Sequence, residues 1–397
     1  MSEWKKVKLG EVANIFSGYA FKSQDMNSTG GIPLIKIKNI ADFIVSTNCD
    51  SFLNKNVDVT KWEKYKLQAD DFLIAMTGQG SVGRVGKMMS FSPSYYVNQR
   101  VAIVRPDATI INPYFLYKCF ATKERENELF NKANGAGQPN ISPSQIGEIE
   151  FSIPTISSQN NIAITLSRYD SLIENYQKQI KLLEEAAQRL YKEWFVDLHF
   201  PGHETIKIVD GVPEGWEKKK LHDFAEVVMG SSPKSEFYNK EKQGLPFHQG
   251  VGSYGTRFVD DNVYTTSITR LAKSNSILFS VRAPVGRLNI TKNKIVIGRG
   301  LAAMNHKDGF QSFLFYMLKD RFFMDNIIGN GSIFASISKV ELLGQEFIVP
   351  PMKTIKAFES FASKLDKKIE SVDTQIRLLT EARDRLLPKL MGGNIEI

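Results

Sequence analysis

Two long stretches of the chain repeat apolar residues at the spacing of a paired helix. In the first stretch the apolar positions advance by four and three residues alternately from Ile162 to Trp194, and in the second they do so from Phe358 to Leu390. This spacing places the apolar side chains on one face of a helix, where a second helix can cover them. Arg383 is the polar exception in the second seam. The pattern predicts two long helices that pair along their apolar faces.

The segments that precede these helices have a different pattern. Short apolar runs such as 33–37 and 101–104 lie between clusters of Gly, Asn, Ser and Pro, which is typical of short strands joined by turns. Large apolar residues recur at helical spacing over 113–132 and near 310–328, so one helix is expected in each segment. Each segment is therefore expected to form a mixed, strand-rich globular domain.

The chain also repeats itself. Ten residues between Asp170 and Leu190 recur between Asp366 and Leu386 at the constant offset of 196. Chance does not produce such agreement at one register, so the chain is a tandem duplication with a period of about 200 residues. The repeat extends to the segments before the helices. Trp4, Leu9, Ala13 and Gly18 match Trp216, Leu221, Ala225 and Gly230. Residues Phe72–Ala75 and Val82-Gly83-Arg84 match Ile277–Ser280 and Val285-Gly286-Arg287.

The duplication predicts an α+β fold in which two strand-rich globular domains are separated by two long antiparallel coiled-coil helices. A 40-residue helix is about 60 Å long, and the linker after the first helix spans at most about 60 Å when fully extended. A parallel pair would need that linker to return along the whole helix, whereas an antiparallel pair lets the second domain begin where the helix ends. The expected parts are domain 1 (1–155), the central helix (156–198), the linker (199–214), domain 2 (215–351) and the distal helix (352–391).

Charge and composition narrow the class of protein. The chain has 51 basic and 43 acidic residues and a net charge of +8, of which +3 lies in 1–155 and +4 in 199–351. Two separate basic blocks suit a polyanion that is contacted twice. There are two cysteines, and no apolar run approaches the roughly 18 residues of a membrane span. We therefore expect a soluble, cytoplasmic protein with neither a disulfide framework, a signal peptide nor a membrane partner.

Some short motifs imitate catalytic or cofactor signatures. Residues 78–83 fit G-x-G-x-x-G, but the residues after them cannot form the helix that a dinucleotide site needs. Residues 112–115 resemble the base-holding loop of amino-methyltransferases, but one proline is missing and no glycine-rich loop precedes them. His199 and His203 have the spacing of metal ligands, but the Pro-Gly pair between them breaks any helix. We expect no catalysis and no metal on this chain.

Three segments carry a resemblance to a known family. They are residues 4–11, 191–197 and 215–221, which read Trp-Lys-Lys-Val-Lys-Leu-Gly-Glu, Tyr-Lys-Glu-Trp-Phe-Val-Asp and Gly-Trp-Glu-Lys-Lys-Lys-Leu. The two Val-Gly-Arg segments and the helices that follow Ile-Pro and Val-Pro-Pro fit the same pattern. Together with the order of the parts, they resemble the specificity subunit of type I restriction-modification systems over essentially the whole chain.

The resemblance implies a non-catalytic DNA-binding chain. Each globular domain would be a target-recognition domain that reads one half of a bipartite site in double-stranded DNA. Two methyltransferase subunits would assemble with the chain, as would translocase-nuclease subunits for cleavage. S-adenosylmethionine and ATP with Mg²⁺ would belong to those partners, and no cofactor to this chain. The residues alone leave two alternatives, a self-contained DNA-modifying enzyme and a coiled-coil scaffold whose terminal domains bind proteins.

Polar side chains on turns next to predicted strands are the candidates for DNA contact. Arg and Lys pair with guanine and Asn and Gln with adenine, while phosphates are contacted by Lys, Arg, Ser and Thr. In domain 1 the candidates are Lys36, Lys38, Asn39, Thr77, Gln79, Ser81, Arg84, Asn98, Gln99, Arg100, Gln138 and Asn140. In domain 2 they are Ser232, Lys234, His248, Gln249, Ser253, Tyr254, Arg257, Arg282, Arg287, Arg299 and Ser332.

The repeat separates these candidates by role. Arg84 and Arg287 hold equivalent positions, so they are expected to serve the framework or a phosphate rather than base discrimination. Gln79 and Arg282 lie in loops that differ between the copies, as the reading of two different half-sites requires.

The end of the central helix is unusually aromatic. Tyr191, Trp194 and Phe195 exceed what one apolar seam needs, so we expect them to form a partner interface. Packing against the neighbouring domain is the alternative.

Overall fold

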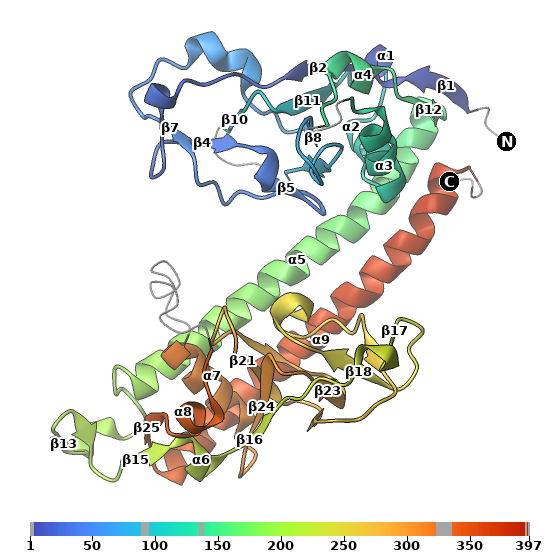
Figure 1. The fold of residues 1–397 in the computed structure, drawn as a ribbon. Helices are drawn as coiled ribbons and strands as arrows, with labels where there is room; N and C mark the ends of the chain where they lie inside the picture. Colours follow the sequence, from blue (N-terminus) through green and yellow to red (C-terminus); the bar gives the residue numbers. More distant parts are fainter. Residues whose placement is uncertain (1–3, 89–94, 135–138, 323–335, 394, 396–397) are drawn as a thin grey trace. The chain divides into compact units, whose positions relative to one another are not determined.

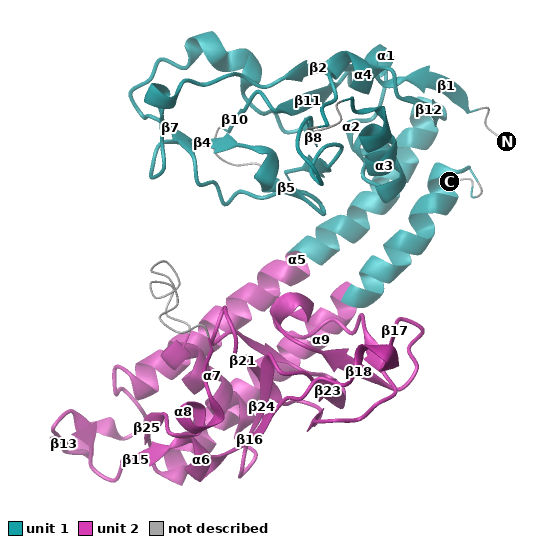
Figure 2. Cartoon of the chain, viewed as in Figure 1, with its two compact units in different colours: residues 1–174, 377–397 teal, residues 175–376 magenta. Residues whose placement is uncertain are grey.

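The chain forms two compact units in the computed structural model, which describes residues 4–88, 95–134, 139–322, 336–393 and 395. Unit 1 comprises residues 1–174 and 377–397, and unit 2 comprises residues 175–376 (Figure 2). Each unit therefore contains one globular domain together with part of both long helices.

The described part of unit 1 is built on a six-stranded sheet (Figure 1). Its order is β2 (Ala13–Ser17), β11 (Val101–Pro106), β8 (Phe72–Ala75), β9 (Val85–Lys87), β6 (Phe43–Val45) and β5 (Ile40–Ala41). A four-stranded sheet has the order β10 (Tyr96–Val97), β4 (Ile32–Ile35), β7 (Phe52–Leu53) and β3 (Met26–Asn27), and β1 (Lys5–Lys8) pairs with β12 (Glu150–Ile153). The apolar runs of the sequence become the central strands, since every residue of β8 and the first four of β11 are buried.

Among the described residues of unit 1, four short α-helices complete the domain: α1 (Leu9–Val12), α2 (Pro113–Phe120), α3 (Lys123–Lys132) and α4 (Pro143–Gly147). The single helix expected over 113–132 is therefore wrong, because the chain turns between α2 and α3. The hydroxyl of Thr122 accepts a hydrogen bond from the N–H of Arg125 and caps α3, which gives the second helix its own start. Asn112 caps α2, and Pro113 is its first residue.

Unit 2 repeats this plan. In the part that the structure describes, one sheet has the order β16 (Ala225–Met229), β24 (Leu301–His306), β21 (Ile277–Ser280) and β22 (Leu288–Ile290). The other has the order β17 (Tyr238–Asn239), β19 (Tyr264–Thr265), β18 (Leu245–His248), β23 (Ile295–Ile297) and β20 (Leu271–Ala272). Two pairs of strands are added, β13 (Ile208–Val209) with β14 (Val212–Pro213), and β15 (Glu217–Lys220) with β25 (Glu346–Val349). The helices are α6 (Leu221–Phe224), α7 (Gln311–Phe322) and α8 (Lys339–Leu343).

Four strands of the six-stranded sheet in unit 1 correspond to the four strands of the first sheet in unit 2. In unit 1, β11 pairs antiparallel with β2 and β8. In unit 2, β24 pairs antiparallel with β16 and β21. The strands β9 and β22 then flank β8 and β21. The internal repeat is therefore a repeat of structure as well as of sequence.

The two long helices are α5 (Ile156–Phe195) and α9 (Met352–Met391). In unit 1, Asp170 of α5 pairs with Arg383 of α9. In unit 2, Trp194 near the end of α5 lies against Phe358 near the start of α9, with ring centroids 6.0 Å apart. Rising residue numbers in α5 meet falling numbers in α9, so the pair is antiparallel, as the sequence predicted. Among the described ranges, no helix is both long enough and apolar enough to cross a membrane.

Candidate nucleic-acid interface

The loops that carry most of the predicted DNA contacts in unit 1 are tied together by backbone hydrogen bonds. They follow β2, β4, β8 and β10 or precede α4, and comprise residues 18–20, 35–39, 76–84, 98–100 and 139–141, which we call loop cluster 1. The bonds run from Gly18 N to Val101 O (2.9 Å), from Tyr19 N to Val97 O (2.9 Å), from Asn98 N to Ile35 O (3.0 Å), from Met76 N to Arg100 O (3.0 Å) and from Ile141 N to Met76 O (2.9 Å).

Unit 2 contains the same arrangement. Loop cluster 2 comprises residues 230–232, 248–250, 281–287, 298–300 and 336–337. Each bond above has a counterpart: Gly230 N to Leu301 O (2.9 Å), Ser231 N to Ile297 O (2.9 Å), Gly298 N to His248 O (2.8 Å), Val281 N to Gly300 O (2.9 Å) and Ile337 N to Val281 O (2.9 Å). The duplication has therefore preserved the backbone that holds these loops.

A repeated glycine makes this backbone compact. A Cβ atom at Gly18 would lie 2.2 Å from the carbonyl oxygen of Val97, and one at Gly230 would lie 2.1 Å from the carbonyl oxygen of Gly298. No side chain fits at either position without moving the backbone. The glycine that the repeat preserves is thus a requirement of close backbone approach.

The side chains that this common backbone carries are different in the two clusters. Residues that make corresponding backbone bonds, or lie next to ones that do, hold equivalent positions in the two clusters. The equivalent pairs are Gln99 and Arg299, Arg100 and Gly300, Lys36 and Gln249, Thr77 and Arg282, and Asn140 and Ser336. The backbone is constant and the donors and acceptors of the side chains change.

The residues predicted to contact DNA in domain 1 are divided by exposure. Those exposed to solvent are Lys38, Gln79, Gln99, Arg100 and Asn140. Those half-buried are Lys36, Thr77, Ser81, Arg84 and Asn98. The lysines are partly engaged, because the ammonium of Lys36 donates to the Ser51 hydroxyl (2.7 Å) and Lys38 forms an ion pair with Asp50.

In domain 2 the corresponding division is similar. The exposed candidates are Lys234, Gln249, Arg282 and Arg299. The half-buried ones are Ser232, Ser253, Tyr254 and Arg287. Ser232 serves the framework, since its hydroxyl accepts a hydrogen bond from the N–H of Arg299 (3.2 Å). Gln138 and Ser332 lie outside the described residues.

Arg257 is a clear correction to the list of DNA contacts. Its side chain is 2 % exposed and forms ion pairs with Asp366 (2.6 Å) and Glu184 (3.4 Å). Its guanidinium also lies over the ring of Phe315, 3.7 Å from the centroid. A buried guanidinium with these partners is part of the core and cannot reach a nucleic acid.

Asn39 is also structural rather than free to bind DNA. It is 4 % exposed. Its amide nitrogen donates to the carbonyl oxygens of Ser46 and Asn48, and its amide oxygen accepts from the N–H of Lys36. All of its hydrogen-bonding groups are therefore used to close a turn.

A third correction concerns the His248 turn. The ring of His248 is buried, and its nitrogens bond the hydroxyl of Ser253 (2.7 Å) and a carboxylate oxygen of Asp261 (2.9 Å). The Tyr254 hydroxyl is buried as well, and this burial raises the pKa of Tyr254. His248 and Ser253 therefore bond each other within the turn, and the buried hydroxyl of Tyr254 is not presented to a ligand.

The glycine-rich motif of residues 78–83 forms a tight turn between β8 and β9. Gly78, Gly80 and Gly83 all have positive φ angles. No helix follows, so the segment lacks the geometry of a dinucleotide site. Within the part of the chain that the structure describes, no cluster of three or more His, Cys, Asp or Glu side chains could hold a metal ion.

Two exposed side chains beside the clusters were missed by the sequence analysis. Asn134 exchanges two backbone hydrogen bonds with Asn140, each 2.9 Å long. The carbonyl oxygen of Arg270 accepts from the N–H of Ile297 (2.9 Å), next to loop cluster 2. The backbone bonds to Asn140 and Ile297 place these two residues beside the clusters, and the sequence pattern did not indicate those bonds.

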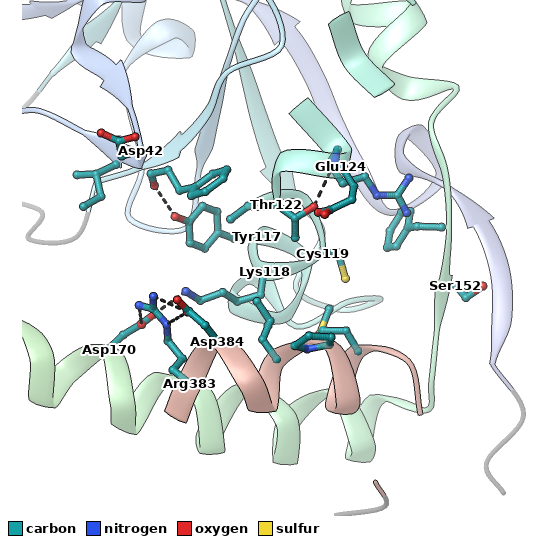
Figure 3. Close-up of a pocket in the computed structure, with 18 residues that line it drawn as sticks. Asp42, Tyr117, Lys118, Cys119, Thr122, Glu124, Ser152, Asp170, Arg383 and Asp384 are labelled. Carbon is teal, nitrogen blue, oxygen red and sulfur yellow. Dashed lines mark hydrogen bonds and ion pairs between the residues drawn. The ribbon is translucent and has the colours of Figure 1, made fainter. Parts of the chain in front are cut away.

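A pocket of about 760 Å³ lies in unit 1 between α2, α3 and the adjoining parts of the long helices (Figure 3). Figure 3 shows Lys118 directed toward Asp170 and Arg383. The carboxylate of Asp170 accepts from the ammonium of Lys118 (2.7 Å), the guanidinium of Arg383 (2.8 Å) and the hydroxyl of Tyr114 (2.5 Å). Burial alone would raise the pKa of Asp170, but these cations and hydrogen bonds outweigh it and lower that pKa. Asp384 also pairs with Arg383 (2.7 Å), so two carboxylates balance two cations, and the cluster explains the polar residue in the second seam.

The predicted partner interface is buried. Tyr191 and Trp194 are each 7 % exposed and pack on Phe358, at centroid distances of 5.9 and 6.0 Å. Phe195 packs on Phe313 at 5.2 Å. Tyr191 and Trp194 belong to the core of unit 2 and the half-buried Phe195 packs against it, which favours the alternative of packing against the neighbouring domain.

Comparison with known proteins places the chain in a family. The sequence model of the type I restriction modification DNA specificity domain matches residues 1–185 and 213–381. The chain is 27 % identical to the type I restriction enzyme MjaIX specificity subunit of Methanocaldococcus jannaschii, over 100 % of this chain and 94 % of that protein. It is 22 % identical to the HindI specificity subunit of Haemophilus influenzae, over the full length of both chains.

The solved structure of the type I restriction-modification system S subunit from M. genitalium has the same fold. Its TM-score is 0.61 at 16 % identity, and the match covers 98 % of this chain and 96 % of that one. Both copies of the repeat match the family, and the matched residues include both loop clusters. The chain therefore belongs to the type I restriction-modification DNA specificity family, as a non-catalytic specificity subunit that recognises DNA sequence.

Proposed function

We propose that the chain reads a bipartite, asymmetric target in double-stranded DNA, with one recognition domain for each half-site. The observation that carries the proposal is the pair of loop clusters, which have the same backbone hydrogen bonds and different exposed side chains. Equal backbones present side chains to DNA in the same way, and unequal side chains select different bases. The placement of the net charge, +3 in 1–155 and +4 in 199–351, supports one contact with the phosphate backbone for each domain.

The proposal gives the long helices the role of a spacer. Each of them has 40 residues and no described loop interrupts either one. Ion pairs in both units tie the domains to these helices, through the buried Asp170 in unit 1 and the half-buried Asp366 in unit 2. A stiff helical pair of fixed length would set the number of base pairs between the half-sites.

The chemistry of the system is proposed to lie on other chains. Two methyltransferase subunits would bind S-adenosylmethionine, and translocase-nuclease subunits would bind ATP with Mg²⁺. The names of the similar proteins, which are restriction enzyme specificity subunits, support such an assembly. The cytoplasm, where such subunits meet chromosomal DNA, is the proposed location.

The test is to produce the chain together with its methyltransferase subunits and to map the methylated adenines in the host DNA. The expected motif has two specified halves of different sequence separated by unspecified bases. The purified complex should bind a duplex with this motif, and the logarithm of the affinity should fall steeply with the logarithm of the salt concentration. Duplexes with one half-site scrambled are the controls. A single contiguous motif, or binding that does not depend on salt, would contradict the proposal.

A further inference from the structure

The turn before the central strand occupies the same place in both loop clusters. In unit 1, residues 98–100 lead from β10 into β11, and in unit 2, residues 298–300 lead from β23 into β24. In both turns the first N–H of the strand donates to the carbonyl oxygen of the first turn residue, at 3.0 Å. The middle residue is Gln99 in one turn and Arg299 in the other. These two residues therefore hold equivalent positions.

The backbones of both middle residues are held in place while their side chains remain available. The N–H of Gln99 donates to the carbonyl oxygen of Tyr19 (2.9 Å), and the N–H of Arg299 donates to the hydroxyl of Ser232 (3.2 Å). Both side chains are exposed, and within the described ranges neither makes a hydrogen bond or ion pair of its own. A polar side chain on a fixed backbone loses little conformational freedom beyond its own rotamers when it binds.

The chemistry of the two side chains differs in the way that base readers differ. A glutamine amide presents one donor and one acceptor, which match N7 and N6 of adenine. An arginine guanidinium presents two parallel donors, which match O6 and N7 of guanine. By contrast, Arg84 and Arg287 are the same residue at one repeat position and are half-buried, so they cannot distinguish the two halves.

We propose that positions 99 and 299 are corresponding base-reading positions, where Gln99 selects an adenine in one half-site and Arg299 selects a guanine in the other. The inference rests on the proposed function, since it requires that each domain reads its own half-site. It goes further by assigning one residue and one base to each half.

The test exchanges the two side chains in the full chain assembled with its methyltransferase subunits. The variants are Arg299→Gln and Gln99→Arg, and the matched control is Lys294→Gln. Lys294 is an exposed cation at the other end of β23, so its substitution removes the same charge from the same unit without touching the turn. Methylated sites are mapped in host DNA, and duplexes with each of the four base pairs at the affected position compete for the purified complex.

The expected result is a reciprocal change of specificity. Arg299→Gln should shift one position of one half-site from guanine toward adenine, and Gln99→Arg should shift one position of the other half-site from adenine toward guanine. A good bidentate contact predicts a change in the preference ratio of about 5- to 150-fold. The Lys294→Gln motif should equal that of the wild type. Because competition reports preference among bound duplexes, it remains informative when a variant is partly unfolded.

Three results separate the possible failures. If Arg299→Gln weakens all duplexes equally and leaves the motif unchanged, Arg299 contacts a phosphate and the inference is wrong. If neither exchange changes the motif or the affinity, the turn does not contact DNA and the inference is again wrong. If the wild-type complex methylates no bipartite motif, the proposed function itself fails before the variants are compared.

Discussion

The two units hold an equivalent aspartate, buried in unit 1 and half-buried in unit 2, in different ways. Asp170 of unit 1 and Asp366 of unit 2 are related by the constant offset of the repeat. In unit 1 the guanidinium comes from Arg383 on the facing helix α9. In unit 2 the position that corresponds to Arg383 is Ala187, and the guanidinium comes instead from Arg257 in the globular domain. The aspartate is therefore the same in both copies of the repeat, whereas the arginine that pairs with it comes from a different position in each.

The difference shows how each domain is joined to the helices. In unit 1, Lys118 of α2 donates to the aspartate together with the helix arginine. In unit 2, Tyr316 of α7 donates to the aspartate at 2.7 Å together with Arg257. Buried ion pairs contribute little net stability when intact, but they are costly to break because one charge is left buried without its partner. Substitutions at the cations therefore test the comparison directly.

Arg257→Ala is expected to have the largest effect. It removes a buried guanidinium that packs on Phe315 and leaves the half-buried carboxylate of Asp366 without that partner, so the free energy of unfolding should fall by about 3 to 5 kcal/mol. Urea unfolding of the full chain measures the loss. The matched control is Arg270→Ala, an exposed arginine of the same unit, which should change stability by at most about 0.5 kcal/mol.

A second variant tests the comparison further by placing the arginine on the long helix of unit 2. Ala187→Arg in the Arg257→Ala background places a guanidinium where unit 1 has one, so part of the lost stability should return. A loss below about 1 kcal/mol for Arg257→Ala alone would show that the ion pair is not part of the core.

Trp194→Ala is expected to rank next. Trp194 packs on Phe358 in the core of unit 2, whereas the equivalent residue of unit 1 is the smaller Leu390. Removal of the ring should reduce the free energy of unfolding by about 3 kcal/mol, measured by urea unfolding. Phe361→Ala is the control, because Phe361 is 56 % exposed beside the same ring. If Trp194→Ala left stability unchanged and abolished co-purification with the methyltransferase, the residue would belong to a partner interface after all.

Arg383→Ala should have a smaller effect than Arg257→Ala. The guanidinium of Arg383 is 24 % exposed, and Lys118 and Tyr114 still donate to Asp170 after its removal. A decrease of about 1 to 3 kcal/mol is expected in the same unfolding measurement. Arg377→Ala is the control on the same helix, since Arg377 forms a surface ion pair with Glu381 and should contribute less than about 0.5 kcal/mol. Equal losses at Arg257 and Arg383 would remove the contrast between the units.

The last prediction concerns a fragment that lacks the second copy of the repeat. Residues 1–213 contain one domain and one long helix, and two such fragments can pair their helices as α5 pairs with α9. The pairing would place Ala187 of one fragment opposite Asp170 of the other, so one cation is lost while Lys118 remains. We expect a symmetric homodimer that reads the first half-site twice, as an inverted repeat. Light scattering measures the dimer, and methylation mapping with the methyltransferase supplied measures the target. A folded fragment that stays monomeric at high concentration would contradict the pairing.

The amino-acid sequence determined those features whose physical cause is local or repeated. The seam spacing determined the long helices, because steps of three and four residues define one helical face. The repeat identified Gly18 and Gly230 as a matched pair, and the structure supplies the reason in the close approach of two backbones. The loops that bear the exposed candidates, including Gln99 and Arg299, were likewise found from turn residues beside apolar runs.

Only the tertiary structure decided which polar residues remain on the surface. Arg257 has the local sequence of an ordinary turn, but the carboxylate that binds it lies 109 residues away. His248 and Asn39 are buried by turns that fold back on them. The same applies to Trp194, whose neighbours come from a helix that begins more than 150 residues later. Burial depends on contacts between segments distant along the chain, and the local pattern of one sequence does not specify those contacts.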